Sequence, residues 1–295
     1  MTLSMKLDLA IKAKEATASA DGYVIKDKDC YSTYMTNAEW DTFVEGMSAQ
    51  ALAEYGAGGG GELCEKNGRP PKMACYGSSS RMIYLLSRDK EKDGFHYEKK
   101  LSTTVGGTAN LDGFLDRGDR YVLIEAKCHE PYSAKTHSVS HSYEALYTFI
   151  NENMAKELEI ATEKSKCGRY LNVTFRAGGE MIAHFDLKQM ICHLLGAATG
   201  ALTGKLDKKK YSFLYLLYDP TALPITEEAR AEIDAIYKRT VYECGLIDFK
   251  KLFRVILAFL QGKITKKKLS EEDVEQIANG FTFTLTSQND YRNHL

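Results

Sequence analysis

Residues 110–127 read NLDGFLDRGDRYVLIEAK, and this stretch decides the fold. Its second half, Arg120 to Lys127, contains four apolar residues in succession, which is typical of a strand buried on both faces. Its first half belongs to a second strand candidate, Ala109 to Asp116. Arg117-Gly118-Asp119 supplies the short turn of a hairpin between them. The stretch therefore predicts two adjacent strands joined by a tight turn.

Three charged side chains interrupt these apolar strands. Glu125 and Lys127 are two residues apart, so they project from the same face of their strand. Counting back from the turn places Asp112 level with Glu125 on the neighbouring strand. Converging carboxylates suit Mg²⁺, which takes oxygen ligands and keeps several waters, and a neighbouring lysine can stabilise charge that develops on phosphorus. The pattern favours metal-dependent phosphodiester hydrolysis, with a structural salt bridge as the alternative.

Periodic patterns on both sides of the hairpin predict a mixed α/β fold. Upstream, serines 78–80 precede an apolar stretch to Arg88 and indicate a capped helix, and Phe95 to Leu101 alternates like a strand. Downstream, Asp186 to Thr199 is an amphipathic helix that Asp186 can cap, and Tyr211 to Tyr218 is a buried strand. The order is helix, three strands, an insertion, helix and strand, which indicates a sheet between helices.

The rest of the chain carries weaker patterns. We expect helices over 38–55, 138–166, 226–243 and 248–261, a strand over 170–176 and an edge strand over 281–288. A glycine run at 56–61 and a Pro-Pro pair at 70–71 mark a structural boundary. We therefore expect a mostly helical N-terminal extension over 1–77, a core over 78–220 with an insertion at about 128–184, and a helical C-terminal extension over 221–295 packed on the core.

The composition suits a globular protein with a sizeable core, because 44% of the residues are hydrophobic and 27% are charged. We expect a cytoplasmic protein without membrane contact, since no apolar run or secretory signal is evident. The seven scattered cysteines include no C-x-x-C pair and indicate reduced thiols. A net charge of −1 gives no global signature of nucleic-acid binding. Local lysine clusters at 99–100, 205–210 and 266–268 could still contact phosphates, with a solvated surface as the simpler interpretation of each.

The hairpin and its charged residues resemble the PD-(D/E)XK nuclease superfamily, with Asp112 as the first acid and Glu125-Ala126-Lys127 as the second half of the motif. More narrowly, YEKKLSTTVGGTANLDGFL followed by VLIEAKCHEPY looks like a bacterial group of restriction-endonuclease-like proteins. The superfamily resemblance covers about residues 78–220. It implies a restriction-endonuclease-like core of order αβββαβ, with a mixed central sheet flanked by helices.

The resemblance also implies an activity and a cofactor. Asp112, Glu125 and the Ala126 carbonyl would bind Mg²⁺, or Mn²⁺ in its place, with Lys127 near the attacking water. The implied reaction is endonucleolytic hydrolysis of DNA that leaves a 5′-phosphate, and restriction is a biological role that rests on the resemblance alone. An enzyme that cuts both strands of duplex DNA with one active site per chain would be expected to act as a homodimer.

Many members of the superfamily add an acid from the first core helix, but Ser79 to Arg88 contains no Asp or Glu. We expect Glu98, in the first strand, to supply that carboxylate as a further catalytic and metal-binding residue. Glu62, after the glycine run, is the second choice. A structural or exposed role for Glu98 is the alternative.

Other residues could contact the substrate because of where they lie around these elements. The N–H groups at the start of the first core helix could hold a phosphate, with simple capping as the alternative. Gln189 and His193 are four residues apart and share a face of the helix that begins at Asp186, as in some superfamily branches, with a buried structural role equally open. His129 and Tyr132 follow the strand that carries Glu125. The candidates are Ser79, Ser80, Arg81, His129, Tyr132, Gln189 and His193.

Two competing interpretations remain open. The first is a non-catalytic protein that keeps the nuclease fold and binds nucleic acid or a protein partner, against which the intact Asp112, Glu125 and Lys127 argue. The second is a metal-dependent hydrolase with a non-nucleic substrate, which the position of the lysine disfavours. The sequence indicates neither a recognition sequence nor a preference between DNA and RNA.

Overall fold

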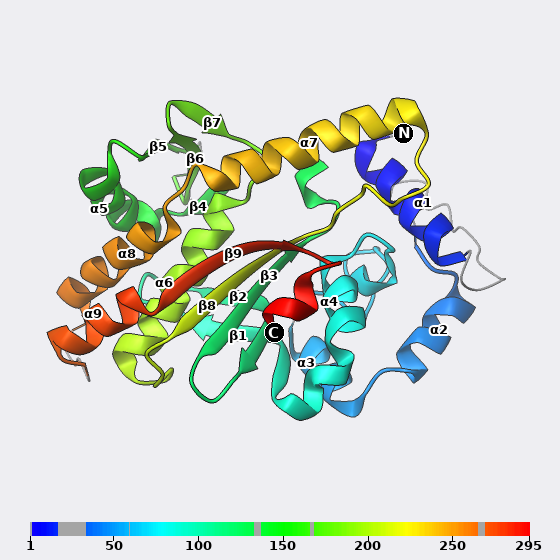
Figure 1. The fold of residues 1–295 in the computed structure, drawn as a ribbon, viewed down its shortest axis with the longest axis horizontal. Helices are drawn as coiled ribbons and strands as arrows, with labels where there is room; N and C mark the ends of the chain where they lie inside the picture. The colour runs from blue at the N-terminus through cyan, green and yellow to red at the C-terminus, as the bar shows by residue number, and fades with distance from the viewer. Residues whose placement is uncertain (1, 17–33, 59, 133–136, 166–167, 265–268) are drawn as a thin grey trace.

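The computed structural model describes residues 2–16, 34–58, 60–132, 137–165, 168–264 and 269–295. Its centre is a five-stranded mixed sheet of order β1-β2-β3-β8-β9 (Figure 1). The strands are β1 (Phe95–Ser102), β2 (Thr108–Asp116), β3 (Tyr121–Lys127), β8 (Tyr211–Leu217) and β9 (Phe281–Ser287). The first three pair in antiparallel fashion, whereas β8 and β9 continue the sheet parallel to β3.

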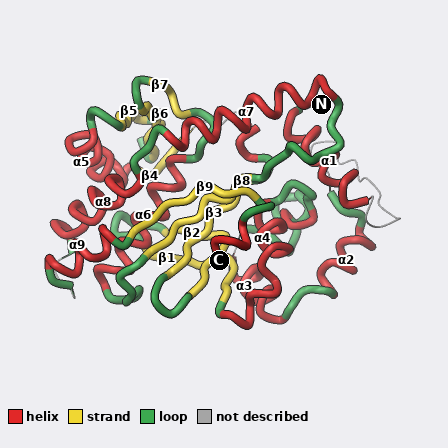
Figure 2. The backbone as a smooth tube through the Cα atoms, in the orientation of Figure 1, coloured by secondary structure: helices red, strands yellow, loops and turns green. Residues whose placement is uncertain are grey.

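Helices cover both faces of this sheet, so the mixed α/β class is confirmed (Figure 2). On one face, called the α6 face, α6 (Leu187–Thr203) packs directly on β1 and β2, with α5 (Glu144–Met154), α8 (Phe249–Lys263) and α9 (Glu271–Asn279) around it. The other face, called the α4 face, is covered by α1 (Leu3–Ala16), α2 (Asn37–Glu45), α3 (Ala49–Gly58) and α4 (Ser79–Ser87). Since each face has its own hydrophobic cluster, β3 is buried along its whole length.

A second, smaller sheet follows β3 in the chain and precedes α6. It has the order β4-β6-β5, with β7 paired to β6, and contains β4 (His137–Ser140), β5 (Leu158–Lys164), β6 (Tyr170–Ala177) and β7 (Glu180–Ile182). The strand predicted over 170–176 is confirmed. The helix predicted over 138–166 is wrong outside α5, because Leu158 and Ile160 alternate with exposed residues and bury one face of β5.

Three further expectations needed correction. The single helix expected over 38–55 is two helices, since α2 ends at Glu45 and Ser48 accepts the Ala51 N–H at the start of α3. The C-terminal extension is not only helical, because it also contains β9, and the edge strand expected over 281–288 is thereby confirmed. The same segment contains α9, which the sequence patterns missed and which a capping box at Ser270 begins.

The two long helices predicted after β8 are confirmed as α7 (Glu227–Gly245) and α8. In Figure 1, α7 runs along one side of the molecule toward α1. In the described part of the chain, no helix combines the length and apolar character that crossing a bilayer requires. Five cysteines in that part are free thiols, while Cys30 and Cys167 lie outside it.

The close approach of α6 to the sheet depends on Gly196. A Cβ at this position would lie 2.9 Å from the Cβ atoms of both Ala109 and Leu101. We expect Gly196→Ala to lower the free energy of unfolding by about 1–2 kcal/mol, because overpacking outweighs the gain in helix propensity. Gly262→Ala in α8 is the matched control, since a Cβ there meets nothing within 4 Å. Urea denaturation that shows the same effect for both variants would contradict this packing.

Candidate active site

Three carboxylates lie side by side across neighbouring strands. The pairs that flank Glu98 in β1 place it opposite Asp112 in β2. The last pair between β2 and β3, Gly113 with Ile124, places Asp112 beside Glu125. The level placement of Asp112 and Glu125 that was counted from the turn is therefore confirmed, and Glu98 joins them on the third strand.

The backbone of β1 changes conformation at this point. Glu98 has a φ of 48°, in the left-handed region that residues other than glycine seldom adopt. As a result the alternation of the strand is interrupted, with Tyr97 in the α4-face cluster and Leu101 in the α6-face cluster. Such a conformation costs roughly 1–3 kcal/mol and persists where the surrounding structure fixes it. The strain therefore falls on a residue of the candidate site.

Asp112 is oriented by the end of the β2–β3 pairing. Its Oδ2 accepts the N–H of Ala126 at 2.7 Å, and Ala126 lies two residues beyond the last backbone pair. Burial, together with the charge of Glu125, raises the pKa of Asp112 well above its usual range, while Lys127 opposes this shift. The side chain is thus held against β3, in surroundings where a nearby positive charge would favour its ionised form.

Glu125 and Lys127 form a buried ion pair, with 2.6 Å between Lys127 Nζ and Glu125 Oε1. Helix α6 supplies a further partner to each, since Gln189 Oε1 accepts from Lys127 Nζ at 2.6 Å and His193 Nε2 lies 2.7 Å from Glu125 Oε2. Burial would raise the pKa of Glu125, but the charges of Lys127 and His193 lower it. Burial would lower the pKa of Lys127, but Glu125 and Asp186 raise it well above its usual range. Both groups are therefore held in their charged forms.

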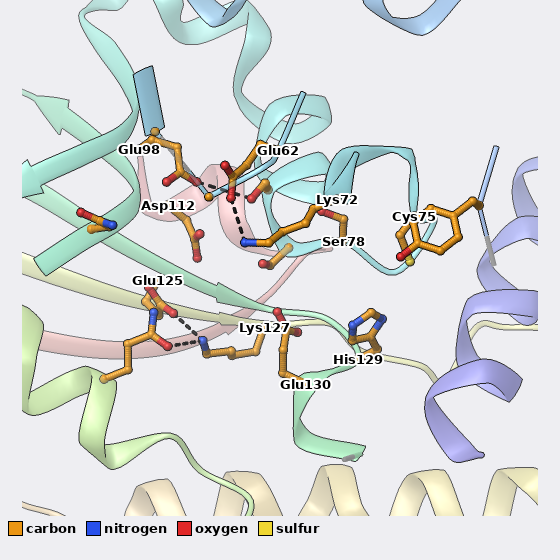
Figure 3. A pocket seen from close by; sticks show the side chains of 17 residues that line it. Glu62, Lys72, Cys75, Ser78, Glu98, Asp112, Glu125, Lys127, His129 and Glu130 are labelled. Atoms are coloured by element: carbon orange, nitrogen blue, oxygen red, sulfur yellow. Dashed lines mark hydrogen bonds and ion pairs between the residues drawn. The ribbon is translucent and has the colours of Figure 1, made fainter. Parts of the chain in front are cut away.

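These residues open on a cavity of about 460 Å³ that lies between the α4 side of the sheet and Gln189 of α6 (Figure 3). Its lining is polar, and comes from the strand ends, the start of α4 and the segment that follows α3. The lining residues are Tyr34, Gly58, Gly60, Glu62, Lys72, Cys75, Ser78, Ser79, Ser80, Glu98, Asn110, Asp112, Glu125, Lys127, His129, Glu130 and Gln189.

Glu62 brings a fourth carboxylate to this cavity from a loop distant in sequence. It is 5% exposed; its Oε1 accepts from Lys72 Nζ at 3.1 Å, and its buried Oε2 has no hydrogen-bond partner among the described residues. In Figure 3 the carboxylates of Glu62 and Glu98 point toward one another. A Cβ at Gly60 would lie 2.6 Å from Glu62 Oε2, so the glycine run makes room for this side chain.

The carboxyl group of Glu98 titrates well above the range of an ordinary glutamate. Burial, then the charges of Glu62 and Glu125, raise the pKa of its carboxyl to about 7. Its Oε1 also accepts a long hydrogen bond, 3.5 Å, from Ser80 Oγ at the start of α4. Glu98 and Glu62, the first and second choices for the additional carboxylate, both line the cavity, and their catalytic role stays a prediction.

The remaining predicted residues separate into two groups. Ser79, Ser80, His129 and Gln189 line the cavity, whereas Arg81, Tyr132 and His193 do not. Arg81 points elsewhere, because its guanidinium binds Glu15 of α1 at 2.7 and 2.9 Å. Tyr132 is buried in the α4-face cluster. These three positions therefore do not support the predicted substrate contacts.

The shared face of Gln189 and His193 on α6 is confirmed, but His193 holds Glu125 and has 1% exposure. Ala126 is fully buried and is not among the lining residues, so its carbonyl as a metal ligand stays a prediction. The sequence did not single out Lys72 or Asn110 as site residues. The preceding glycine run was the one local signal for the loop that carries Glu62 and leads to Lys72.

The lysine clusters that were considered as phosphate contacts differ in their surroundings. Lys208, Lys209 and Lys210 each form an ion pair with an aspartate, at 2.8, 2.5 and 3.2 Å. Lys100 donates to the Ala57 carbonyl at 2.6 Å. The cluster at 266–268 lies outside the described residues. The lysines of 208–210 are therefore already engaged by carboxylates, which weakens their case as a phosphate-binding patch.

Comparison with models of protein families, with curated proteins and with solved structures finds no significant match to this chain. The geometry of the cavity and its charges are therefore the observations from which a function can be argued.

The raised pKa of Glu98 makes the stability of the protein depend on pH. Its ordinary value is 4.5, and in the folded protein it is about 7. Between these values the folded chain keeps a proton that the unfolded chain releases, so the free energy of unfolding falls as the pH rises. Without divalent cations, Glu98→Gln should remove a slope worth up to about 3 kcal/mol. Urea titrations across this range measure it, with the exposed Glu159→Gln as control, and an unchanged slope in Glu98→Gln would refute the assignment.

The His193 side chain is expected to stabilise the ionised Glu125 that it contacts. His193→Leu removes one partner of a buried charged group, which typically costs about 3–5 kcal/mol. His193→Gln keeps a donor on the same helix face and should recover part of this loss. Thermal or urea unfolding measures both, with the more exposed His141→Leu as control. A loss no larger in His193→Leu than in His141→Leu would show that the contact carries little energy.

Proposed function

We propose that this protein is a Mg²⁺-dependent endonuclease that hydrolyses phosphodiester bonds of DNA at Asp112, Glu125 and Lys127. The observation that carries the proposal is the convergence of Asp112 and Glu125, on neighbouring strands, beside the buried ammonium of Lys127 in an open cavity. The order α4, β1, β2, β3, α6, β8 supports a restriction-endonuclease-like core, in which this convergence is the expected site.

The charge of the cavity supports a requirement for a cation. Among the described residues, five carboxylates line it, against two lysines and one histidine, His129; the carboxylates are Glu62, Glu98, Asp112, Glu125 and Glu130. An uncompensated cluster of this kind would repel a phosphodiester, whereas a hard divalent cation prefers such oxygen ligands. The buried Glu62 Oε2 without a hydrogen bond also fits a role in holding a cation or its water. Asp112, Glu125 and Glu98 would hold Mg²⁺, with the Ala126 carbonyl as the further ligand that the motif implies.

The residues then have separate roles. Mg²⁺, when bound, neutralises phosphate charge and lowers the pKa of a water molecule. Lys127 keeps its proton, so it acts as a donor to the phosphate or to the attacking water and not as a base. Glu98 lies opposite Asp112 and would complete the oxygen ligands of the cation or hold its bound water. Gln189 and His193 orient Lys127 and Glu125, respectively.

A cleavage assay on plasmid and linear DNA tests the proposal. We expect wild type to cut with Mg²⁺ or Mn²⁺ and to leave 5′-phosphates, and Asp112→Asn and Lys127→Ala to lose at least about 100-fold in rate. Asp116→Asn is the matched control, because Asp116 lies on the same strand as Asp112 but is exposed and outside the cavity. It should cut like wild type.

Two outcomes would contradict different parts of this account. If wild type and Lys127→Ala are equally inert on DNA and on RNA at several divalent-cation concentrations, the protein is not a nuclease, and a binding role that retains the fold takes its place. If wild type cuts and Asp112→Asn cuts equally well, the activity stands and the assigned site is wrong. Cleavage of RNA in preference to DNA would correct the substrate alone.

A further inference from the structure

A second group of metal-ligating side chains lies at the other end of the cavity. Asp8 of α1, Cys75 after the short helix Lys72–Ala74, and His129 after β3 each place a donor atom within 4.8 Å of the other two. His129 Nδ1 is 3.0 Å from Asp8 Oδ1, and Cys75 Sγ is 3.7 Å from Asp8 Oδ2. Figure 3 shows Cys75 and His129 on the side of the cavity away from Glu98 and Glu125.

The burial of this group separates it from an ordinary surface cluster. Asp8 is 0% exposed and Cys75 is 4% exposed, while His129 is partly exposed and lines the cavity together with Cys75. The backbone of Gly77 approaches closely, because a Cβ there would lie 2.7 Å from His129 Nδ1. A carboxylate, a thiol and an imidazole from three distant segments are therefore brought together in a space that excludes most water.

The chemistry of these donors differs from that of the carboxylate cluster. Thiolate sulfur and imidazole nitrogen favour Zn²⁺, whereas Mg²⁺ takes oxygen ligands almost exclusively. In a tetrahedral zinc site the ligand atoms are about 3.3–3.8 Å apart, as follows from zinc–ligand bonds of about 2.0–2.3 Å. The three donor atoms lie within 4.8 Å of one another, so they would need to approach by at most about 1–1.5 Å to reach these separations.

We propose that Asp8, Cys75 and His129 bind one Zn²⁺ ion, distinct from the Mg²⁺ site. Three protein ligands leave a fourth position for a water or a phosphate oxygen. Because Cys75 and His129 line the cavity, that position opens toward it. The ion would tie α1 and the segment after Lys72 to the end of β3, two residues beyond Lys127. The zinc ion would then link α1 to the end of β3.

Metal content and cobalt spectroscopy test this site without any assay of cleavage. Full-length protein is dialysed against Zn²⁺ in excess Mg²⁺, so that the oxygen-only cluster is occupied by the competing ion, and then against metal-free buffer. We expect about one zinc ion per chain in wild type. Co²⁺ in place of Zn²⁺ should give a thiolate-to-metal charge-transfer band, which requires a cysteine ligand. Cys75→Ser and Asp8→Asn should lower zinc affinity by at least about tenfold, and Cys75→Ser should abolish the band.

Cys244→Ser is the matched control, because Cys244 is also 4% exposed but lies in the α6-face cluster. It should keep both the zinc and the cobalt band. Circular dichroism identifies the variants that fold. If a variant does not fold, its comparison is replaced by the effect of Zn²⁺ on the thermal stability of wild type and of Cys244→Ser, which should both be stabilised because both keep the site. Folded wild type without zinc or a thiolate band, or a Cys75→Ser variant that retains both, would overturn the proposal. Since none of these readouts involves DNA, they leave the nuclease assignment to its own assay.

Discussion

A carboxylate buried at the end of a central strand imposes the strongest constraint on this structure. Glu125 is wholly removed from solvent and keeps its charge only because Lys127 and His193 contact it. Lys127 lies on the same strand, but His193 comes from α6, so the position of that helix on the sheet is coupled to the charge of Glu125. The close packing of Gly196 against β1 and β2 lets the helix approach near enough to make this contact.

The cavity is completed by segments that lie before the core in the sequence. Glu62 and Lys72 come from the loop after α3, and Gly58 and Gly60 pack closely on the carboxylates of Glu98 and Glu62. The N-terminal part of the chain is therefore a wall of the candidate site as well as a covering of the α4 face. Helix α4 contains no acid, and Glu62 brings a carboxylate to the cavity from a loop.

What the sequence could predict depended on short-range regularity. Asp112, Glu125 and Lys127 follow from the period of two along a strand and a short turn, and Gln189 and His193 follow from the spacing of four on a helix. The left-handed backbone of Glu98 depends on packing between distant segments, so no local pattern indicates it. The same holds for Asp8, Cys75 and His129, which only the folded chain brings together. For Glu62 the glycine run before it was the one local signal. The strand β5 was missed because its charged composition masks a buried alternation of two residues, Leu158 and Ile160.

The central claim is that Asp112 and Glu125 share a divalent cation beside Lys127. A crystal structure of the full chain with Mn²⁺, which is located by its anomalous scattering, tests this most directly. The account predicts an anomalous peak between the Asp112 and Glu125 carboxylates and within coordination distance of the Ala126 carbonyl. A saturated crystal with no peak there, or with its cation bound only by residues outside the cavity, would contradict it.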